Sequence, residues 1–409
     1  MMSFISTTFG DFLSIQRGHD LPQNSRVEGV VPVAGSSGVV GFHNEGKGPV
    51  PGITIGRSGS IGEVNYYRNE YFPLNTTLYV TNFHGNDPKF SFYFLKNFDF
   101  TSFDSGSVQP SLNRNFLNPA LIEIPSVEEQ KAIAHILGTL DDKIELNQKM
   151  NQTLEDIAKA IFKSWFVDFD PVRAKMDGRP TGLPPEISDL FPDELVDSEI
   201  GEIPKGWEIV IVSDFGKVVC GKTPSTQDAE NFDGPFPFIT IPDMRGNLLS
   251  LSTDRTVSTK GASALKGKML PAGSICVSCI ATPGLVSVTT SDSFTNQQIN
   301  SIVPSDQINR EYLLFSMMTF GDLISSAGSG GSVFSNLSTG RFKELPILQP
   351  CEKTRTVFSK MTRPILQRLE ISQKEISTLS ELRDTLLPKL ISGELRIPDA
   401  EKFLKEAGL

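Results

Sequence analysis

The feature that most constrains this chain is an internal duplication, because a sequence that repeats itself at a distance of over 200 residues folds as two copies of one unit. Matching motifs recur in the same order, at offsets that drift from 203 to 225 residues. Such drift is expected when loops carry insertions and the scaffold is shared. The matched pairs are Asp11-Phe12 with Asp214-Phe215, Arg17-Gly18 with Cys220-Gly221, Gly62 with Gly284, Asn75 with Asn296, Gly106-Ser107-Val108 with Gly331-Ser332-Val333, and Ile124-Pro125 with Leu345-Pro346.

Each copy of the repeat ends in a long stretch that has the hydrophobic spacing of a coiled coil. In both stretches the seam residues step by four and three positions, which places them along one side of a helix. Each helix should span about 40 residues, or about 60 Å at 1.5 Å per residue. The seam residues are Ile133, Leu137, Leu140, Ile144, Asn147, Asn151, Leu154, Ala158, Ile161 and Trp165 in the first stretch, and Ile365, Leu369, Ser372, Ile376, Leu379, Arg383, Leu386 and Leu390 in the second.

Polar residues interrupt both seams near the middle. If the two helices pack antiparallel, Asn147 of the first faces Ser372 of the second, so polar side chains meet and this arrangement is favoured over a parallel one. The alternative is that each helix packs separately on its own globular unit. We expect Pro364 to start or kink the second helix and Pro388 to end or kink it, because proline lacks the N–H that a helix interior needs.

The segments that precede the helices combine short strands with one short helix in each copy, at 90–98 and 310–318. A proline-rich, acidic connector over 167–204 lacks long regular elements. The predicted fold class is therefore α+β, with two homologous mixed α/β units joined by two long antiparallel coiled-coil helices in a pseudo-two-fold arrangement. Strands are predicted where β-branched and aromatic residues cluster, at 53–55, 78–80, 209–212, 238–241 and 275–277.

The length and composition agree with a soluble chain of more than one domain. A chain of 409 residues exceeds an ordinary domain of about 100–200 residues. No uncharged apolar run approaches the roughly 18 residues of a membrane-spanning helix, and the first residues lack the pattern of a secretory signal. Four cysteines without a paired framework suit a reducing compartment. We therefore expect a cytoplasmic protein that does not enter a membrane.

The net charge of −10 is distributed unevenly. Residues 126–200 carry a net charge of −8, whereas residues 1–125 and 201–349 carry −2 each and residues 350–409 carry +2. This balance argues against a protein whose entire surface binds nucleic acid. It leaves room for a local binding groove, because most of the excess acid lies in one central block.

Catalytic motifs are absent from the sequence. There is no phosphate-binding loop, no Gly-x-Ser-x-Gly, no His-Glu-x-x-His, and neither of the Asn-Pro-Pro-Tyr and Asp-Pro-Pro-Tyr motifs of amino-methyltransferases. Cys276 and Cys279 have the spacing of a zinc-binding pair, but on a strand they would point to opposite faces, and a zinc site needs two further ligands. We therefore assign no catalytic residue, no metal ligand and no cofactor.

Polar residues in the predicted loops are the candidates for contacts with nucleic acid. The turn at 56–62 carries Arg57 and Ser58 between glycines, and such a turn can bring a guanidinium to a phosphate or a guanine edge. The alternative is a plain β-turn with an exposed arginine. Asn and Gln pair with adenine, and Arg with guanine. The other candidates are Arg17, Lys47, Gln109, Asn113 and Arg114 in the first copy, and Lys222, Thr223, Asp243, Arg245, Gln297, Gln298 and Asn336 in the second.

In its motifs and in their order, the chain resembles the specificity subunit of type I restriction–modification systems. The resemblance covers nearly the whole length, and the duplicated order of the motifs carries more weight than any one of them. The motifs are ITIGRSGSIGEV at 53–64, PLNTTL at 73–78, IP at 124–125, EQKAIA at 129–134, GEIPKGW at 201–207, GKTPS at 221–225, IPDM at 241–244 and LPKLISGEL at 387–395.

The resemblance implies a domain organisation and a role in reading DNA. Two target recognition domains would each read one half of a bipartite, asymmetric DNA target, and the two long helices would set the spacer and dock methyltransferase subunits. The implied segments are the first target recognition domain at 1–125, the first long helix at 126–166, the connector at 167–204, the second target recognition domain at 205–349, the second long helix at 350–391 and a tail at 392–409.

The resemblance also implies partners. The chain would be a non-catalytic subunit that acts on double-stranded DNA, together with two modification subunits that methylate adenine using S-adenosylmethionine and with ATP-dependent restriction subunits. Trp165 and Phe166 are candidates for contact with such a partner, and a role in the core is the alternative.

One departure between the copies bears on what each unit reads. The turn that contains Arg57 in the first copy is replaced by Ser278-Cys279-Ile280-Ala281 in the second, so the two units cannot read the same bases through this loop. A non-palindromic target follows. Two other classes of function stay open: an adaptor with tandem β-rich modules on a coiled coil, which would not bind duplex DNA, and an enzyme with an unfamiliar site.

Overall fold

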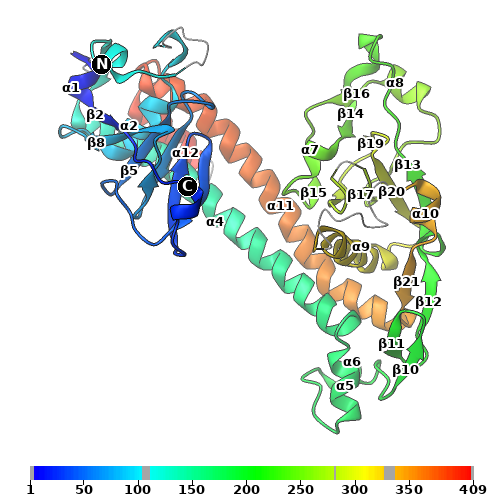
Figure 1. Ribbon diagram of the computed structural model, residues 1–409. Coiled ribbons are helices and arrows are strands. Elements are labelled where there is room, and N and C mark those ends of the chain that lie inside the picture. Colours follow the sequence, from blue (N-terminus) through cyan, green and yellow to red (C-terminus); the bar gives the residue numbers. More distant parts are fainter. Residues whose placement is uncertain (1–3, 104–110, 281, 327–336, 407–409) are drawn as a thin grey trace. The chain divides into compact units, whose positions relative to one another are not determined.

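The computed structural model describes residues 4–103, 111–280, 282–326 and 337–406 (Figure 1). The chain forms two compact units. The first unit comprises Met1–Leu146 and Ile376–Leu409, and the second comprises Asn147–Glu375. Each of the two long helices has one half in each unit, so the units do not coincide with the domain boundaries expected from the sequence.

The first unit is built on three small sheets with a short helix against one of them. Helix α2 (Pro88–Lys96) begins at Asp87, whose side chain accepts the N–H of Phe90, and it packs its aromatic face into the core beside Phe12. The larger, four-stranded antiparallel sheet has the order β2 (Ser14–Arg17), β8 (Thr77–Asn82), β5 (Gly52–Gly56), β6 (Val64–Tyr67). The second sheet has the order β4 (Gly38–His43), β3 (Val31–Gly35), β7 (Phe72–Pro73), and in the third β1 (Phe4–Thr8) pairs with β9 (Leu121–Pro125). The unit also contains the short helices α1 (Phe9–Phe12) and α3 (Arg114–Leu117).

The second unit repeats this topology, which confirms the predicted duplication. Its larger sheet has the same strand order with one more strand at its edge, and its second sheet again combines one antiparallel and one parallel pair. The larger sheet has the order β13 (Gly216–Cys220), β20 (Ile299–Pro304), β17 (Ile275–Ser278), β18 (Val286–Thr289), β15 (Leu249–Ser250). The second sheet has the order β16 (Thr256–Val257), β14 (Phe232–Ile239), β19 (Phe294–Thr295), and the third pairs β12 (Glu208–Ile211) with β21 (Pro346–Gln349). The helices are α7 (Ile241–Met244), α8 (Thr259–Ala264), α9 (Ile308–Ser326) and α10 (Thr339–Lys343).

One of the sequence matches between the copies was misaligned by four residues. In the first unit, Thr8 pairs with Leu121, and in the second unit Ile211 pairs with Pro346. The proline that ends β9, Pro125, therefore matches Pro350 rather than Pro346. The side chains agree with this register, because Gln130 Nε2 donates to the Pro125 carbonyl at 3.0 Å and Arg355 Nε donates to the Pro350 carbonyl at 3.1 Å.

The two long helices are α4 (Val127–Phe166) and α11 (Glu352–Ile391), each of 40 residues. In the first unit, the first half of α4 shares a core with the last turns of α11, through Leu140 and Leu386 among others. In the second unit, the second half of α4 shares a core with the first half of α11, through Phe162 and Leu366 among others. The helices are therefore antiparallel, as predicted, and each half is also packed on its own globular unit.

Both prolines of α11 lie inside the helix rather than at its ends. Because Pro364 and Pro388 lack an N–H, each removes one helical hydrogen bond. Buried neighbours such as Leu366 and Leu390 anchor the helix on either side of these positions. A helix start at Pro364 and a helix end at Pro388 are therefore wrong, and the alternative expectation, a kink at either proline, stays a prediction.

Polar side chains do interrupt the helix seam in its middle. Asn147 and Ser372 both belong to the second unit and are 2% and 0% exposed. The Nδ2 group of Asn147 and the Oγ atom of Ser372 have no hydrogen-bond partner among the described residues. A buried polar group without a partner costs free energy, so this layer is the weakest part of the seam.

The connector between the two copies contains only short elements, as predicted. Pro171 lies in the first turn of α5 and Pro184 is the N-cap of α6, and a hairpin follows these helices. Phe169 and Phe191 of the connector pack on Trp207, which ties this segment to the core of the second unit. The elements are α5 (Asp170–Met176), α6 (Pro185–Ser188), β10 (Leu195–Ser198) and β11 (Gly201–Pro204), and the chain ends with α12 (Ile397–Glu406).

A buried carboxylate fastens α9 to α11 in the second unit. Glu311 is 0% exposed; it accepts hydrogen bonds from Ser359 at 2.7 Å and Arg363 at 3.2 Å, and forms an ion pair with Arg310 at 2.5 Å. Burial alone would raise the pKa of the Glu311 carboxyl, but the hydrogen bond from Arg363 and the charge of Arg310 hold the pKa below its ordinary value. The ionised form therefore stabilises the fold.

Replacing Glu311 by Gln should destabilise the second unit at pH 7 by roughly 2 kcal/mol, because two arginines lose their charged partner. Since the folded pKa is depressed, the contribution of the carboxylate is complete above the unfolded value of about 4.3 and is lost as pH falls through the folded value. The difference between wild type and variant should therefore shrink on acidification. Urea unfolding followed by the fluorescence of Trp165 and Trp207, both buried in the second unit, measures it.

A matched control on α11 is Glu370→Gln. Glu370 forms a more exposed i,i+4 pair with Lys374 at 2.7 Å, and such pairs contribute about 0.5 kcal/mol or less. Equal losses of stability in the two variants, or a loss in the Glu311 variant that does not change with pH, would contradict the assignment.

Candidate nucleic-acid interface

At one end of the larger sheet of the first unit, backbone hydrogen bonds join four loops. The N–H of Gly18 donates to the Thr77 carbonyl at 3.0 Å, and the N–H of Arg57 donates to the Thr76 carbonyl at 2.9 Å. The N–H of Leu112 then donates to the Arg57 carbonyl at 2.9 Å. We call these loops, residues 17–20, 56–62, 73–77 and 111–114, the first loop edge.

The second unit builds the same arrangement from equivalent residues. The N–H of Gly221 donates to the Ile299 carbonyl at 3.1 Å, and the N–H of Cys279 donates to the Gln298 carbonyl at 2.9 Å. The N–H of Leu337 donates to the Cys279 carbonyl at 3.1 Å. We call residues 220–223, 278–280, 295–299 and 337 the second loop edge.

These bonds correct a second match between the copies. Because Thr76 and Gln298 accept the equivalent bond, Asn75 corresponds to Gln297. Asn296, which the sequence paired with Asn75, corresponds instead to Leu74. Two glycines support this match of Leu74 with Asn296. A Cβ on Gly18 would lie 2.1 Å from the carbonyl oxygen of Leu74, and a Cβ on Gly221 would lie 2.1 Å from the carbonyl oxygen of Asn296. Both positions therefore require glycine.

The turn that carries Arg57 is shaped by glycines. Gly59 and Gly62 have φ of 81° and 78°, a region that side chains disfavour, and a Cβ on Gly56 would lie 1.9 Å from the Ser60 carbonyl oxygen. The turn is therefore fixed, and its backbone is hydrogen-bonded to the neighbouring loops. Arg57 is half-buried, and its guanidinium has no hydrogen-bond or ion-pair partner in the described part of the chain.

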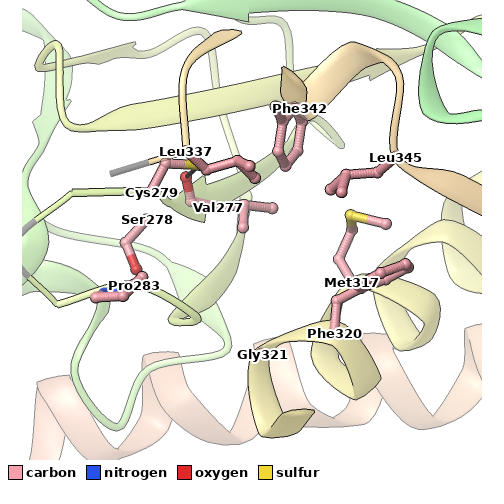
Figure 2. A pocket seen from close by; sticks show the side chains of 10 residues that line it. All are labelled: Val277, Ser278, Cys279, Pro283, Met317, Phe320, Gly321, Leu337, Phe342 and Leu345. Atoms are coloured by element: carbon pink, nitrogen blue, oxygen red, sulfur yellow. Dashed lines mark hydrogen bonds between the residues drawn. The ribbon is translucent and has the colours of Figure 1, made fainter. Parts of the chain in front are cut away.

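At the equivalent position of the second loop edge the cation is replaced by a buried thiol. Cys279 is 2% exposed, and burial raises its pKa. Figure 2 shows it facing a small apolar cavity of about 10 Å³, together with Leu337, Phe342 and Met317. Cys276 lies on β17, where burial raises its pKa to about 12. Within the described residues, no group of three or more potential metal ligands gathers.

The remaining candidates of the first copy lie on or beside the first loop edge. The guanidinium of Arg17 pairs with Asp20 at 3.1 Å. The ammonium of Lys47 lies 5.4 Å from the centre of the Phe72 ring, which in turn contacts His19 at this edge. Asn113 is occupied as the cap of α3, because its side chain accepts the N–H of Asn115, whereas Arg114 is exposed. Ser58 donates its N–H to the Thr76 carbonyl, and Gln109 lies outside the described residues.

Most candidates of the second copy also lie on its loop edge. Lys222 is exposed, and its N–H donates to the Thr295 carbonyl. The hydroxyl of Thr223 donates to Gln297 Oε1 at 2.9 Å. Gln298 is half-buried between its neighbours, and Asn336 lies outside the described residues.

Asp243 and Arg245 belong to α7 and to the residue after it. The Asp243 carboxylate accepts the N–H of Thr240 at 2.7 Å and the N–H of Asp254 at 3.0 Å, so it is engaged in holding the backbone. Arg245 is exposed. The segment before α7 reaches the second loop edge, since the Ile239 carbonyl accepts the N–H of Asn296 at 3.4 Å.

Trp165 and Phe166 are core residues, in agreement with the alternative that the sequence left open beside contact with a partner. They are 3% and 5% exposed, and they belong to an aromatic cluster with Phe191, Trp207 and Phe358 in the second unit. The helical spacing could not distinguish this burial from an outward face. Side chains that are so fully covered offer no surface to another subunit.

Two hydrogen-bonded pairs of polar side chains were not predicted from the sequence. Asn75 Nδ2 donates to the carboxylate of Asp20 in the first loop edge. Asn296 Nδ2 donates to Gln298 Oε1 at 3.1 Å in the second. The repeat had marked Asn75 and Asn296 only as parts of a shared scaffold, and no signal in one sequence would have revealed their partners.

Comparisons with known proteins agree with this architecture. A family model described as "Type I restriction modification DNA specificity domain" matches residues 6–156 and 204–381. The specificity subunit of the type I restriction enzyme HindI from Haemophilus influenzae is 38% identical over 327 residues, which is 70% of this chain and 71% of that protein. The MjaIX specificity subunit from Methanocaldococcus jannaschii is 27% identical over 299 residues, 72% of this chain and 65% of that protein.

A solved structure shows the same fold. The crystal structure of a type I restriction–modification S subunit from M. genitalium matches with a TM-score of 0.60, over 95% of this chain and 96% of that one, at 16% sequence identity. Among the described residues, no helix is long and apolar enough to cross a membrane. With a family model that matches well over half of its length and a relative at 38% identity, the chain belongs to the DNA specificity subunits of type I restriction–modification systems.

Proposed function

We propose that each unit reads one half of a bipartite, asymmetric DNA target with its loop edge. The observation that carries this proposal is that the same backbone arrangement is built twice but presents different side chains, such as Arg57 in one copy and the buried Cys279 in the other. A scaffold that holds the loops by backbone hydrogen bonds leaves the side chains free to set specificity. Bases are distinguished by hydrogen bonds to their edges in the major groove.

The charge of the chain bears on how it holds DNA. Residues 1–125 and 201–349, which contain the two loop edges, carry a net charge of −2 each, while residues 126–200 carry −8. Phosphate contacts supply most of the sequence-independent affinity for DNA, and the loop edges present few cations. We therefore assign base reading to this chain and much of the phosphate contact to its partner subunits.

The two long helices set the distance between the half-sites. Each helix has one half in each unit, and both cores include residues from both helices. The unread spacer in the target should therefore follow from helix length. The chemistry of methylation and cleavage belongs to modification and restriction subunits, in keeping with the absence of the usual catalytic motifs from the sequence. In the cell this assembly acts on double-stranded DNA in the cytoplasm.

Exchanging residues 1–125 for the corresponding segment of a relative should change one half of the target and leave the other half unchanged. The exchange keeps the β1–β9 pair intact, because both strands lie inside the segment. Genome-wide mapping of methylated adenines, in cells that carry the chimera with its modification subunits, measures both halves. A chimera that alters both half-sites would show that the units do not read independently.

Inserting one heptad into each long helix should lengthen the spacer by about three base pairs. Seven residues add about 10 Å of helix, and DNA rises about 3.4 Å per base pair. The insertions belong after Ile144 in α4 and before Ile376 in α11, so that the seam stays in register. Methylation mapping should return the same two half-sites with a longer gap, at reduced efficiency because the second unit also rotates about the duplex.

The control for this experiment carries the heptad in α4 alone, which breaks the seam and should abolish methylation. An unchanged spacer in the double insertion, with activity retained, would mean that something other than the helices sets the distance between the half-sites.

The duplicated architecture should bind two methyltransferase subunits per chain. Each copy offers a similar face made of one globular unit and its helix, so two equivalent docking places are expected. Native mass spectrometry of the chain titrated with its modification subunit should show a complex of two to one. A stable one-to-one complex that accepts no second subunit at excess would contradict this stoichiometry.

A further inference from the structure

The two loop edges differ in how their side-chain amides are oriented. In the first loop edge, Asn75 Nδ2 donates to the carboxylate of Asp20, which also pairs with Arg17. An ionised carboxylate only accepts hydrogen bonds, so Asn75 must turn its amino group towards it. The Oδ1 atom and the second N–H of Asn75 stay available, since neither has a partner among the described residues.

In the second loop edge, a short chain of hydrogen bonds imposes the opposite orientation. The backbone N–H of Gln298 donates to Asn296 Oδ1 at 3.0 Å. Because a backbone N–H can only donate, Asn296 must point its oxygen at Gln298 N and its amino group elsewhere. That amino group donates to Gln298 Oε1 at 3.1 Å. The carbonyl oxygen of the Gln298 side chain is thereby turned towards Asn296 and accepts one hydrogen bond, while its Nε2 amino group has no partner among the described residues.

Gln297 is arranged in the same way. The hydroxyl of Thr223 donates to Gln297 Oε1 at 2.9 Å, and the side chain of Gln297 is exposed. Its Nε2 group has no partner in the described part of the chain. Lys222, beside Thr223, adds an exposed ammonium group. Three groups with N–H donors and no partner in the described part of the chain therefore lie at the second loop edge: Gln298 Nε2, Gln297 Nε2 and the Lys222 ammonium.

We propose that the second loop edge is a donor surface that selects guanine, and that Asn296 sets this preference by fixing the amide of Gln298. A glutamine pairs with adenine through one acceptor and one donor, to N6 and N7. The Oε1 atom of Gln298 is turned towards Asn296 and has one lone pair left, whereas both N–H groups of its Nε2 have no partner among the described residues, so the side chain is better matched to a base that offers acceptors. Guanine instead offers two acceptors, N7 and O6, in the major groove. The inference rests on the proposed function and names the base class that this unit reads.

The decisive variant is Asn296→Asp. An aspartate at this position still accepts the N–H of Gln298, so the backbone contact is kept, but it cannot donate to Gln298 Oε1. The Gln298 amide is then free to turn and to pair with adenine. Methylated adenines are mapped genome-wide in cells that carry the full chain with its modification subunits. One position of the second half-site, guanine in the wild type, should accept adenine with a gain of about tenfold or more over the wild type.

A second variant tests the same point without disturbing the orienting bond. In Gln298→Glu, the carboxylate still accepts from Asn296 Nδ2 but presents an oxygen where the wild type presents an amino group. Methylation of targets with guanine at that position should fall at least about tenfold. The matched control is Asp20→Asn, which frees the amide of Asn75 in the other unit and should relax only the first half-site.

The outcomes separate this inference from the function on which it rests. A wild-type target in two halves, with no guanine in the second half, would overturn the inference and leave the proposed function standing. The same holds if both variants methylate with unchanged preferences in the second half-site. A wild type that yields no bipartite target would overturn the proposed function, and the inference with it.

Discussion

The antiparallel pairing of α4 with α11 is the constraint on which the rest of the structure depends. The largest hydrophobic core of each unit includes residues of both helices. Ile133 and Leu386 are part of the core of the first unit, and Phe162 and Leu369 are part of the core of the second. Each helix contributes one half to each unit, so a change in the seam affects the core of the unit in which it lies. The ion pair of Asp141 with Arg383 adds a directional contact between α4 and α11, and that of Glu311 with Arg363 fastens α9 to α11.

The seam also shows where specificity of pairing takes precedence over stability. A hydrophobic pair in place of Asn147 and Ser372 would avoid two buried polar groups without partners. Polar residues at one layer of a coiled coil fix the register of its helices at a cost in stability. In this chain the register matters, because a slip of one heptad would move each half-helix out of its own core.

The parts of the fold that could be predicted from the sequence are those that depend on residues close together in the chain. The spacing of Ile133, Leu137 and Leu140 indicates a helix directly, and the duplicated order of the motifs indicates the shared topology. Matching the copies residue by residue failed where identical residues lay near the true match, as with Asn75 and Asn296, or Pro125 and Pro346. The correct matches rest on backbone hydrogen bonds between loops far apart in sequence.

The candidate site divides in the same way. Polar residues in loops could be nominated from composition, and most of them do lie on the two loop edges. The roles of these residues could not be predicted from composition. The sequence does not show that the side chains of Asp243 and Asn113 accept backbone N–H groups at the start of a helix. The role of Trp165 stayed open between the core and a partner contact for a related reason, because a helical pattern shows which residues share a side but not what covers that side.

The loop edges separate what must stay constant from what is free to vary. Gly18 and Gly221 cannot take a side chain, and the bonds that join the loops use backbone atoms alone, so neither feature depends on which bases are read. The side chains on top of this scaffold carry the differences, and here a single hydrogen bond decides the polarity of an amide. Leu74 stands in the first unit where Asn296 stands in the second. A leucine cannot orient a neighbouring side chain by hydrogen bonding, and Thr76 stands in the first unit where Gln298 stands in the second. On the proposed function, the two units therefore differ in the reading side chains and in the residue beneath them, while they share the scaffold.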